Sequence, residues 1–191
     1  EGLVRAIEEA LAIHPDVLLE RRHEGDDLRV VVIGGAVVAA AVRRPPTITG
    51  NGYATVRELF DELAERRRAA THGAVQLTLD GPTLATLAAS GHQPSSVPAA
   101  GEVVVVRRTA NVHTGGTIDD VTDQLHPGLA DVAMRAAEAI GAPVLGIDLI
   151  VEAVDSPAYV LIEANEQPGL ANHEPQPTAE RFIDLLFPAT G

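Results

Sequence analysis

The segment LRVVVIGGAVVAAAVRR (residues 28–44) decides the fold class. Two apolar runs rich in valine and alanine flank Gly34-Gly35, and such a pair readily takes the positive φ angles of a two-residue hairpin turn. The segment therefore predicts two antiparallel strands. Arg29 and Arg43 lie on opposite arms, so the hairpin could bring both to one anion. An arginine at a strand end is more often a surface charge, and their convergence is a hypothesis.

Helices and strands are expected on both sides of this hairpin. Apolar residues at helical spacing predict helices over residues 2–13, 55–70, 81–91, 129–140 and 178–186. Apolar runs predict further strands over residues 17–20, 103–108, 143–152 and 158–164, whereas residues 111–120 read as a loop. We expect an α+β fold with an antiparallel sheet and packed helices, and a seam between two lobes within residues 44–54.

Composition narrows the classes of function. A length of 191 residues with 46% hydrophobic residues suffices for one sizeable core or two small lobes. There is no secretory signal and no apolar run near the ~20 residues that span a bilayer, which predicts a cytoplasmic protein without membrane contact. The net charge of −13 argues against nucleic-acid binding. Cysteine is absent, which excludes disulfides, thiolate metal sites and cysteine nucleophiles.

The stretch LIEANEQPGL (residues 161–170) ends a predicted strand with polar side chains. If strands 143–152 and 158–164 form a hairpin, Asp148 lies opposite Glu163. Glu163 and Asn165 then share a face, because strand side chains alternate with period two. Two carboxylates and an amide oxygen suit magnesium or manganese. The alternative is a solvated strand end, in which Asp148 only caps a turn.

The loop NVHTGGT (residues 111–117) consists mostly of small residues, whose backbone N–H groups could approach an anion. Its alternative reading is an ordinary flexible turn. His113 and His173 lie in candidate site loops, but no pair of histidines has helical metal-ligand spacing. A zinc-dependent hydrolase that uses them ranks low, because the acid and amide ligands are hard oxygens. All 14 basic residues are arginine, so the chain holds no phosphate-binding lysine.

Three ordered groups of residues carry a resemblance to a known family. They are residues 17–60, the loop TANVHTGGTIDDVTDQLHP (residues 109–127), and GIDLIVEA with VLIEANEQPGL (residues 146–153 and 160–170). Together they resemble the ATP-grasp ligases over nearly the whole chain. The resemblance is in particular to the ATP-grasp part of cyanophycin synthetases and to glutathione-synthetase-like and N-acetylglutaminylglutamine amide synthetase relatives.

The resemblance implies roles for individual residues. Nucleotide-binding positions would be Glu20, Arg22, His23 and Asp27, with Glu20 at the adenine hinge and Asp27 at the ribose. Arg29 and Arg43 would serve catalysis, near the phosphates and the acyl phosphate. Asp148, Glu163 and Asn165 would hold magnesium. The substrates would be bordered by Asn111, Thr114, Gly115, Gly116 and Gly169.

The implied activity is ATP-dependent ligation of a carboxylate and an amine through an acyl phosphate, with ATP and magnesium, or manganese, as cofactors. Amino acids or short peptides would be the substrates, and a homo-oligomer is compatible with the family. ATP-grasp domains also use two lysines and a glycine-rich loop, which would precede the first helix of this chain. We therefore expect the C-terminal portion of an ATP-grasp domain, inactive without an N-terminal remainder. Residues 1–44 would end the nucleotide-clamping lobe, and residues 45–191 would form the lobe with the metal site. The alternative is a non-catalytic nucleotide-binding or assembly module.

Overall fold

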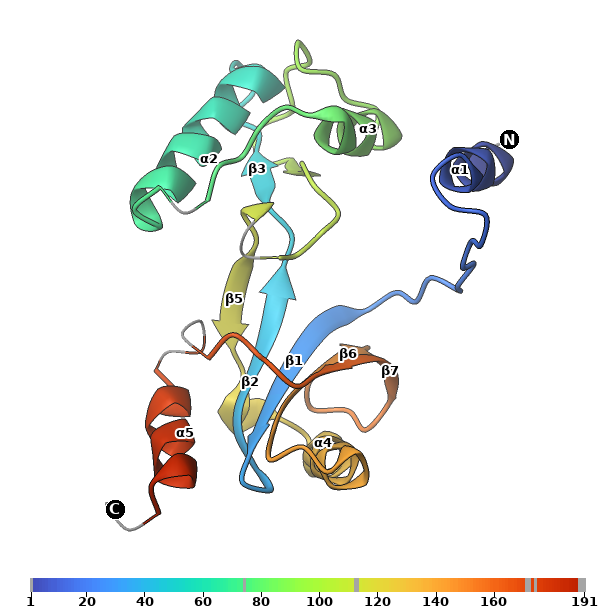
Figure 1. Ribbon diagram of the computed structural model, residues 1–191. Helices are drawn as coiled ribbons and strands as arrows, with labels where there is room; N and C mark the ends of the chain where they lie inside the picture. Colours follow the sequence, from blue (N-terminus) through green and yellow to red (C-terminus); the bar gives the residue numbers. More distant parts are fainter. Residues whose placement is uncertain (1, 74, 112–113, 171–172, 174, 189–191) are drawn as a thin grey trace.

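The computed structural model describes residues 2–73, 75–111, 114–170, 173 and 175–188. Its main sheet is antiparallel, with strand order β5-β2-β1-β6-β7 (Figure 1). The strands are β1 (Asp26–Ile33), β2 (Ala36–Arg44), β5 (Thr117–Asp120), β6 (Val144–Val151) and β7 (Tyr159–Asn165). Helices pack against this sheet, so the expected α+β class with an antiparallel sheet is confirmed.

The hairpin over residues 28–44 forms as predicted. Gly34 and Gly35 have φ angles of 60° and 80°, and β1 pairs with β2 in antiparallel register. The pairing shifts between Val31 and Val32, where the ladder has an irregularity. β1 is the central strand, because its other edge pairs with β6. The hairpin therefore places β1 beside the strand that carries Asp148, and β2 one strand further away.

The strands β6 and β7 are adjacent and antiparallel, as the short connection between them predicts. Asp148 is the Cα partner of Glu163, and Gly146 is the partner of Asn165. On its other side, Asp148 is the Cα partner of Arg29 in β1. Because directly opposed residues point to the same face of a sheet, the register brings these side chains together.

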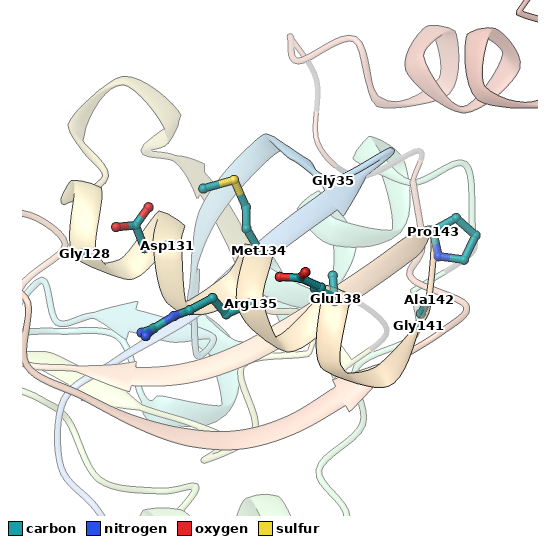
Figure 2. A pocket seen from close by; sticks show the side chains of 10 residues that line it. Gly35, Gly128, Asp131, Met134, Arg135, Glu138, Gly141, Ala142 and Pro143 are labelled. Carbon is teal, nitrogen blue, oxygen red and sulfur yellow. The ribbon is translucent and has the colours of Figure 1, made fainter.

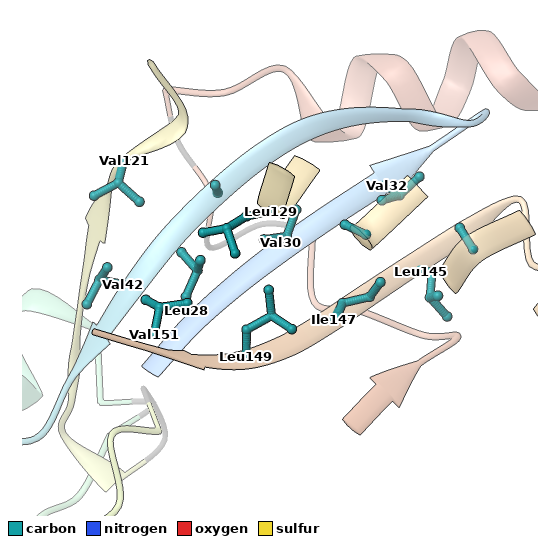
Figure 3. Close-up of a cluster of buried hydrophobic side chains, with 13 residues drawn as sticks. Leu28, Val30, Val32, Val42, Val121, Leu129, Leu145, Ile147, Leu149 and Val151 are labelled. Carbon is teal, nitrogen blue, oxygen red and sulfur yellow. The ribbon is translucent and has the colours of Figure 1, made fainter. Parts of the chain in front are cut away.

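The two faces of the main sheet are covered differently. Helix α4 (Pro127–Ile140) packs on one face and closes the larger core (Figure 3). That core is formed by Leu28, Val30, Val32, Ala40, Val42, Val121, Leu129, Ala133, Ala137, Leu145, Ile147, Leu149 and Val151. Helix α5 (Thr178–Leu186) covers part of the opposite face, over Val31, Ile33 and Ala39. The polar residues lie on this second face, beyond the area that α5 covers.

Residues between β2 and β5 build a separate cluster. It contains β3 (Thr47–Thr49), β4 (Val103–Val105), α2 (Val56–Ala70) and α3 (Gly81–Ala89), and its core includes Ile48, Val56, Phe60, Leu87 and Val104. Thr55 and Glu58 form a capping box at the start of α2, which fixes where the helix begins. The 1–44 and 45–191 division into lobes stays a prediction; in this structure β1 and β2 share one sheet with β6 and β7.

The predicted strand over residues 17–20 is wrong. Helix α1 (Gly2–Leu11) is followed by an irregular segment up to β1, in which Leu18 and Leu19 are 80% and 64% exposed. An apolar run becomes a strand only where another strand pairs with it, and no described residue pairs with this one. No helix among the described residues is long and apolar enough to cross a bilayer.

Two other boundaries differ from expectation. Part of the predicted loop over residues 111–120 is strand β5, whose residues Thr117–Asp120 pair with the edge of β2. The sequence TIDD has weak strand character, so tertiary pairing decides its conformation. The strand expected over residues 103–108 extends only from Val103 to Val105. The remaining helices match their predicted positions closely, and Gly141 ends α4 with a φ of 74°.

Candidate functional site

Two arginines converge on one buried aspartate at the polar face of the sheet. Arg29 donates from Nε to Oδ1 of Asp148, and its Nη2 lies 3.1 Å from Oδ2. Arg43 reaches the same Oδ2 at 3.0 Å and also donates to Oδ1 of Asp27, at 2.6 Å from Nη2. Asp148 is 3% exposed. The predicted convergence of the two arginines is therefore confirmed, and its focus is the carboxylate of Asp148.

A glycine in β6 makes room for this arrangement. A Cβ atom at Gly146 would lie 2.7 Å from Nη1 of Arg29 and 2.8 Å from Cβ of Pro168. Both distances are too short for non-bonded contacts of a carbon atom, so a side chain at position 146 would collide with both groups. The guanidinium group of Arg29 and the ring of Pro168 occupy the space beside Gly146. Sequence reasoning missed this residue, because nothing in the order of residues shows which side chain crosses a glycine.

Glu163 adds a second acid to the same face. Its side chain is exposed, and its pKa is raised above the ordinary value. The main cause is a hydrogen bond to the carboxyl group of Asp148, followed by repulsion from the charge of Asp148. Burial adds to the rise, whereas Arg29 and Arg43 act in the opposite direction. Glu163 therefore holds a proton more readily than a separate glutamate, which marks a position where a cation would be favourable.

The predicted metal ligands offer oxygen atoms that are already partly used. Both carboxylate oxygens of Asp148 accept hydrogen bonds from arginine, and Oδ1 of Asn165 accepts one from the backbone N–H of Gln167 at 2.8 Å. A carboxylate has about four lone-pair sites, so Asp148 can accept a cation as well. No group of three or more acidic or histidine side chains that could hold a metal occurs among the described residues. The set fits magnesium, which needs few protein ligands when substrate phosphates and water supply the rest.

Figure 2 shows a cavity elsewhere on the protein, along α4 and beside the tip of the β1–β2 hairpin. Asp131, Met134, Arg135 and Glu138 contribute side chains to it. It contains none of the predicted site residues, and α4 packs on the sheet face opposite the charged cluster. We therefore place the candidate site at the charged cluster.

Comparisons with known proteins agree with this fold. Residues 103–184 match the RimK-like ATP-grasp domain. The chain is 37% identical to cyanophycin synthetase of Geminocystis herdmanii over 185 residues, which is 90% of this chain and 21% of that protein. It is 30% identical over 200 residues to the glutathione biosynthesis bifunctional protein GshAB of Clostridium perfringens, covering 98% of this chain and 26% of that protein.

A solved structure matches as well. A bifunctional glutathione synthetase from Pasteurella multocida superimposes with a TM-score of 0.67 at 26% identity, over 87% of this chain and 24% of that one. The chain has an ATP-grasp fold. The resemblance expected from the sequence is thus confirmed. The chain spans about a fifth to a quarter of the length of the curated relatives it matches.

The nucleotide-binding positions that the ATP-grasp resemblance implies are spread along the chain. Glu20 and Arg22 are exposed in the irregular segment before β1, and His23 is partly buried there. Asp27 lies at the start of β1, where its carboxylate pairs with Arg43 at 2.6 Å. The structure brings Asp27 to the charged cluster, and it shows no contact between the other three residues and that cluster. Their roles in binding ATP stay predictions.

The loop that would border the substrates of an ATP-grasp ligase is folded onto itself. The carbonyl oxygen of Asn111 accepts hydrogen bonds from the backbone N–H groups of Thr114 and Gly116, each at 3.0 Å. These two N–H groups are therefore occupied, which disfavours the predicted anion contact through them. Gly115 lines a cavity of about 890 Å³ between α2 and β5. His113 lies outside the described residues, and Gly169 is exposed after β7.

Arg67 fixes this loop from helix α2. Its Nε and Nη2 atoms lie 2.9 and 2.8 Å from the carbonyl oxygen of Gly115, and Nη2 lies 2.7 Å from that of Gly116. The sequence places Arg67 within ERRRAA, which reads as a solvated charged helix end, so its contact was not predicted. Two glycine carbonyls receive three charged hydrogen bonds, and the loop is joined to the cluster around α2.

Proposed function

We propose that the ATP-grasp fold of this chain serves an ATP-dependent carboxylate–amine ligase, which forms an amide or peptide bond through an acyl phosphate. The observation that carries the proposal is the convergence of Arg29 and Arg43 with Asp148 and Glu163 at one sheet face. The similarity to cyanophycin synthetase and to GshAB supports amino acids or short peptides as substrates.

The residues of the cluster have separate tasks in this proposal. Phosphoryl transfer from ATP to a carboxylate spreads negative charge over the transferred group, and positioned cations stabilise that charge. Arg29 and Arg43 supply two such cations. Asp148 holds both of them through ion pairs, and Asp27 also pairs with Arg43. Asp148, Glu163 and Asn165 would hold magnesium, or manganese, which neutralises phosphate charge when it is bound. The amine of the second substrate then displaces phosphate and forms the amide.

The lysines of the family cannot come from these 191 residues, because the chain contains none. We therefore expect no ligation by the 191-residue chain alone, and the alternative stays a nucleotide-binding or assembly module without catalysis. The test is amide formation and ADP release with ATP, magnesium and a panel of amino acids and dipeptides. It is run on the 191-residue chain and on any longer product of the same gene.

Glu163→Gln is the decisive variant in that assay. Loss of a positioned electrostatic contact in phosphoryl transfer costs about 3 kcal/mol of barrier, or roughly a hundredfold in rate. Glu166→Gln is the matched control, because Glu166 follows β7 by one residue and is exposed. Wild-type turnover by a folded Glu163→Gln protein removes Glu163 from the mechanism. Nucleotide binding without ADP release in the longer product favours the non-catalytic module.

A further inference from the structure

Described residues between β7 and α5 lie over the polar face of the main sheet. Figure 1 shows the described chain after β7 passing over β1 and β2. Two hydrogen bonds fasten it: Nε2 of Gln176 donates to Oδ2 of Asp120 on β5 at 3.0 Å, and Oγ1 of Thr178 donates to the carbonyl oxygen of Leu170 at 2.7 Å. The first bond joins Gln176 to the edge strand β5, and the second joins Leu170 to the start of α5.

His173 is the exceptional residue of this crossing. It is 5% exposed, and its Nδ1 atom is the only fully buried side-chain nitrogen or oxygen among the described residues that has no hydrogen-bond partner. Its backbone is held in place, because its carbonyl oxygen accepts a hydrogen bond from the N–H of Gln176 at 2.8 Å. Buried polar atoms nearly always have a partner, so one without any indicates a missing ligand or water molecule.

The charges around His173 come from three strands. Burial lowers the pKa of its imidazole most strongly, and the positive charge of Arg29 on β1 lowers it further. Asp120 on β5 acts in the opposite direction, and Arg43 on β2 again lowers the pKa. The ring is therefore neutral at physiological pH and lies within the electrostatic field of both arginines.

We propose that His173 is a ligand-binding residue, whose Nδ1 donates a hydrogen bond to an anionic oxygen held between Arg29 and Arg43. A bound anion is favoured because both neighbours are cations, and an anionic oxygen accepts but does not donate, so Nδ1 must carry the proton. The ion pairs use Nε and Nη2 of each arginine, and Nη1 of each is left outside them. These donors and Nδ1 make up the anion site.

The identity of the oxygen rests on the proposed function. In a carboxylate–amine ligase, it would belong to the carboxylate that is activated or to the phosphoryl group that it receives. Carboxylate and phosphate share the oxyanion chemistry that arginine recognises. We therefore use acetate and inorganic phosphate as separate probes, and the tighter of the two identifies the part of the substrate that contacts His173.

The experiment combines binding titrations with NMR of the imidazole nitrogens of the 191-residue chain. Addition of the preferred probe should shift the ring signals of His173 and raise the pKa of the ring, because the anion offsets the charge of the two arginines. His173→Leu should weaken binding about tenfold or more, the range for a hydrogen bond to a charged group. His173→Asn keeps a donor near the position of Nδ1 and should lose less than about threefold.

His92→Asn is the matched control, because His92 is also largely buried but its Nε2 pairs with Glu102 at 3.0 Å, in the cluster between β2 and β5. Its probe binding should equal that of the wild type. The inference is overturned if neither probe shifts the His173 signals, or if a folded His173→Leu protein binds as the wild type does. The first criterion uses wild-type protein alone, so it decides the matter even where His173→Leu fails to fold.

The outcome separates this inference from the proposed function. Probe binding that depends on His173, without amide formation by any longer product, supports the anion site and overturns the ligase. Two results together support the ligase and overturn the anion site. The first is amide formation by His173→Leu at the wild-type rate and KM, and the second is that neither probe shifts the His173 ring signals of the wild-type protein.

Discussion

Asp148 and Glu163 lie directly opposite each other across β6 and β7, and this pairing raises the pKa of Glu163. The carboxyl group of Asp148 is satisfied by Arg29 and Arg43, whereas among the described residues no basic side chain forms an ion pair with Glu163. The acid on β7 is therefore the part of the cluster whose charge is least balanced. A cation that binds beside Glu163 relieves this imbalance, and a proton competes with it.

The first prediction is a dependence of stability on pH. The folded-state pKa of Glu163 lies above its unfolded value of about 4.3, so its contribution stabilises the fold fully below that pH and is lost as the pH rises through the folded pKa. Without metal, wild-type protein should therefore lose stability relative to Glu163→Gln over this rise. Thermal melts of both proteins from about pH 4 to about pH 8 measure the difference. A constant difference across that range would show that Glu163 is not coupled to Asp148.

The second prediction concerns magnesium. In wild-type protein, magnesium with an ATP analogue should raise the melting temperature more at neutral than at acidic pH, because the metal competes with the proton on Glu163, whose pKa is raised. Magnesium alone should have a small effect, since the site supplies few ligands without phosphates. Glu163→Gln should lose most of the combined effect. Equal melting shifts at both pH values would contradict the assignment of the acids as metal ligands.

The third prediction tests the buried ion pairs. Asp148→Asn removes the counter-charge of Arg29 and leaves Arg43 with Asp27 alone in a partly buried site, and should destabilise the fold by about 3 kcal/mol. Asp119→Asn is the control, because Asp119 pairs with Arg44 at the surface, where its side chain is 55% exposed. That change should cost less than about 1 kcal/mol. Urea unfolding of the three proteins gives the two differences, and equal values would show that burial does not distinguish the pairs.

The fold could be predicted where local signals and pairing agree. The Gly34-Gly35 turn and the short connection after β6 each join neighbouring strands, so the pattern of apolar residues was sufficient for the register at Asp148 and Glu163. It failed at residues 17–20, whose apolar run lacks a pairing strand among the described residues, and at β5, whose polar sequence pairs with β2. In both segments the presence or absence of a distant pairing strand decides the conformation, and a local pattern carries no information about it.

The site could be predicted only in part, for a similar reason. Strand alternation brings Asp148, Glu163 and Asn165 to one face, and the hairpin explains why two arginines reach it. Gly146 and Arg67 were missed, because each acts through a contact between residues that are distant in the sequence. Spacing also gave no sign that both oxygens of Asp148 would already accept hydrogen bonds from the arginines.

The fourth prediction is that Gly146 cannot carry a side chain. Gly146→Ala would place a methyl group against Nη1 of Arg29 and against Pro168, so the guanidinium group or the chain above it must move. The cost should be about 1–3 kcal/mol, as for overpacking elsewhere. Gly81→Ala is the control, because a Cβ there meets nothing within 4 Å at the start of α3. Thermal melts that rank the two variants equally would place Arg29 away from Gly146.

The last prediction concerns the contact between helix α2 and the loop before β5. Arg67 is partly buried and donates three hydrogen bonds to the carbonyl oxygens of Gly115 and Gly116, whereas the neighbouring Arg68 is 59% exposed and pairs with Glu65 on its own helix. Hydrogen bonds to a charged group contribute about 1.5–3 kcal/mol, and an exposed ion pair within one helix about 0.3–0.5 kcal/mol.

Arg67→Ala should therefore destabilise the fold by about 2 kcal/mol, and Arg68→Ala by less than about 0.5 kcal/mol. The loop gives a more specific measurement than global stability. In Arg67→Ala, the backbone amides of Thr114 and Gly116 should exchange hydrogen faster, because the carbonyl groups that fix the loop lose their donor while the bonds to Asn111 remain. Arg67→Lys should restore part of the protection, since an ammonium group reaches one carbonyl but lacks the planar fork that serves two. Unchanged exchange in a folded Arg67→Ala protein would show that the loop keeps its shape without α2.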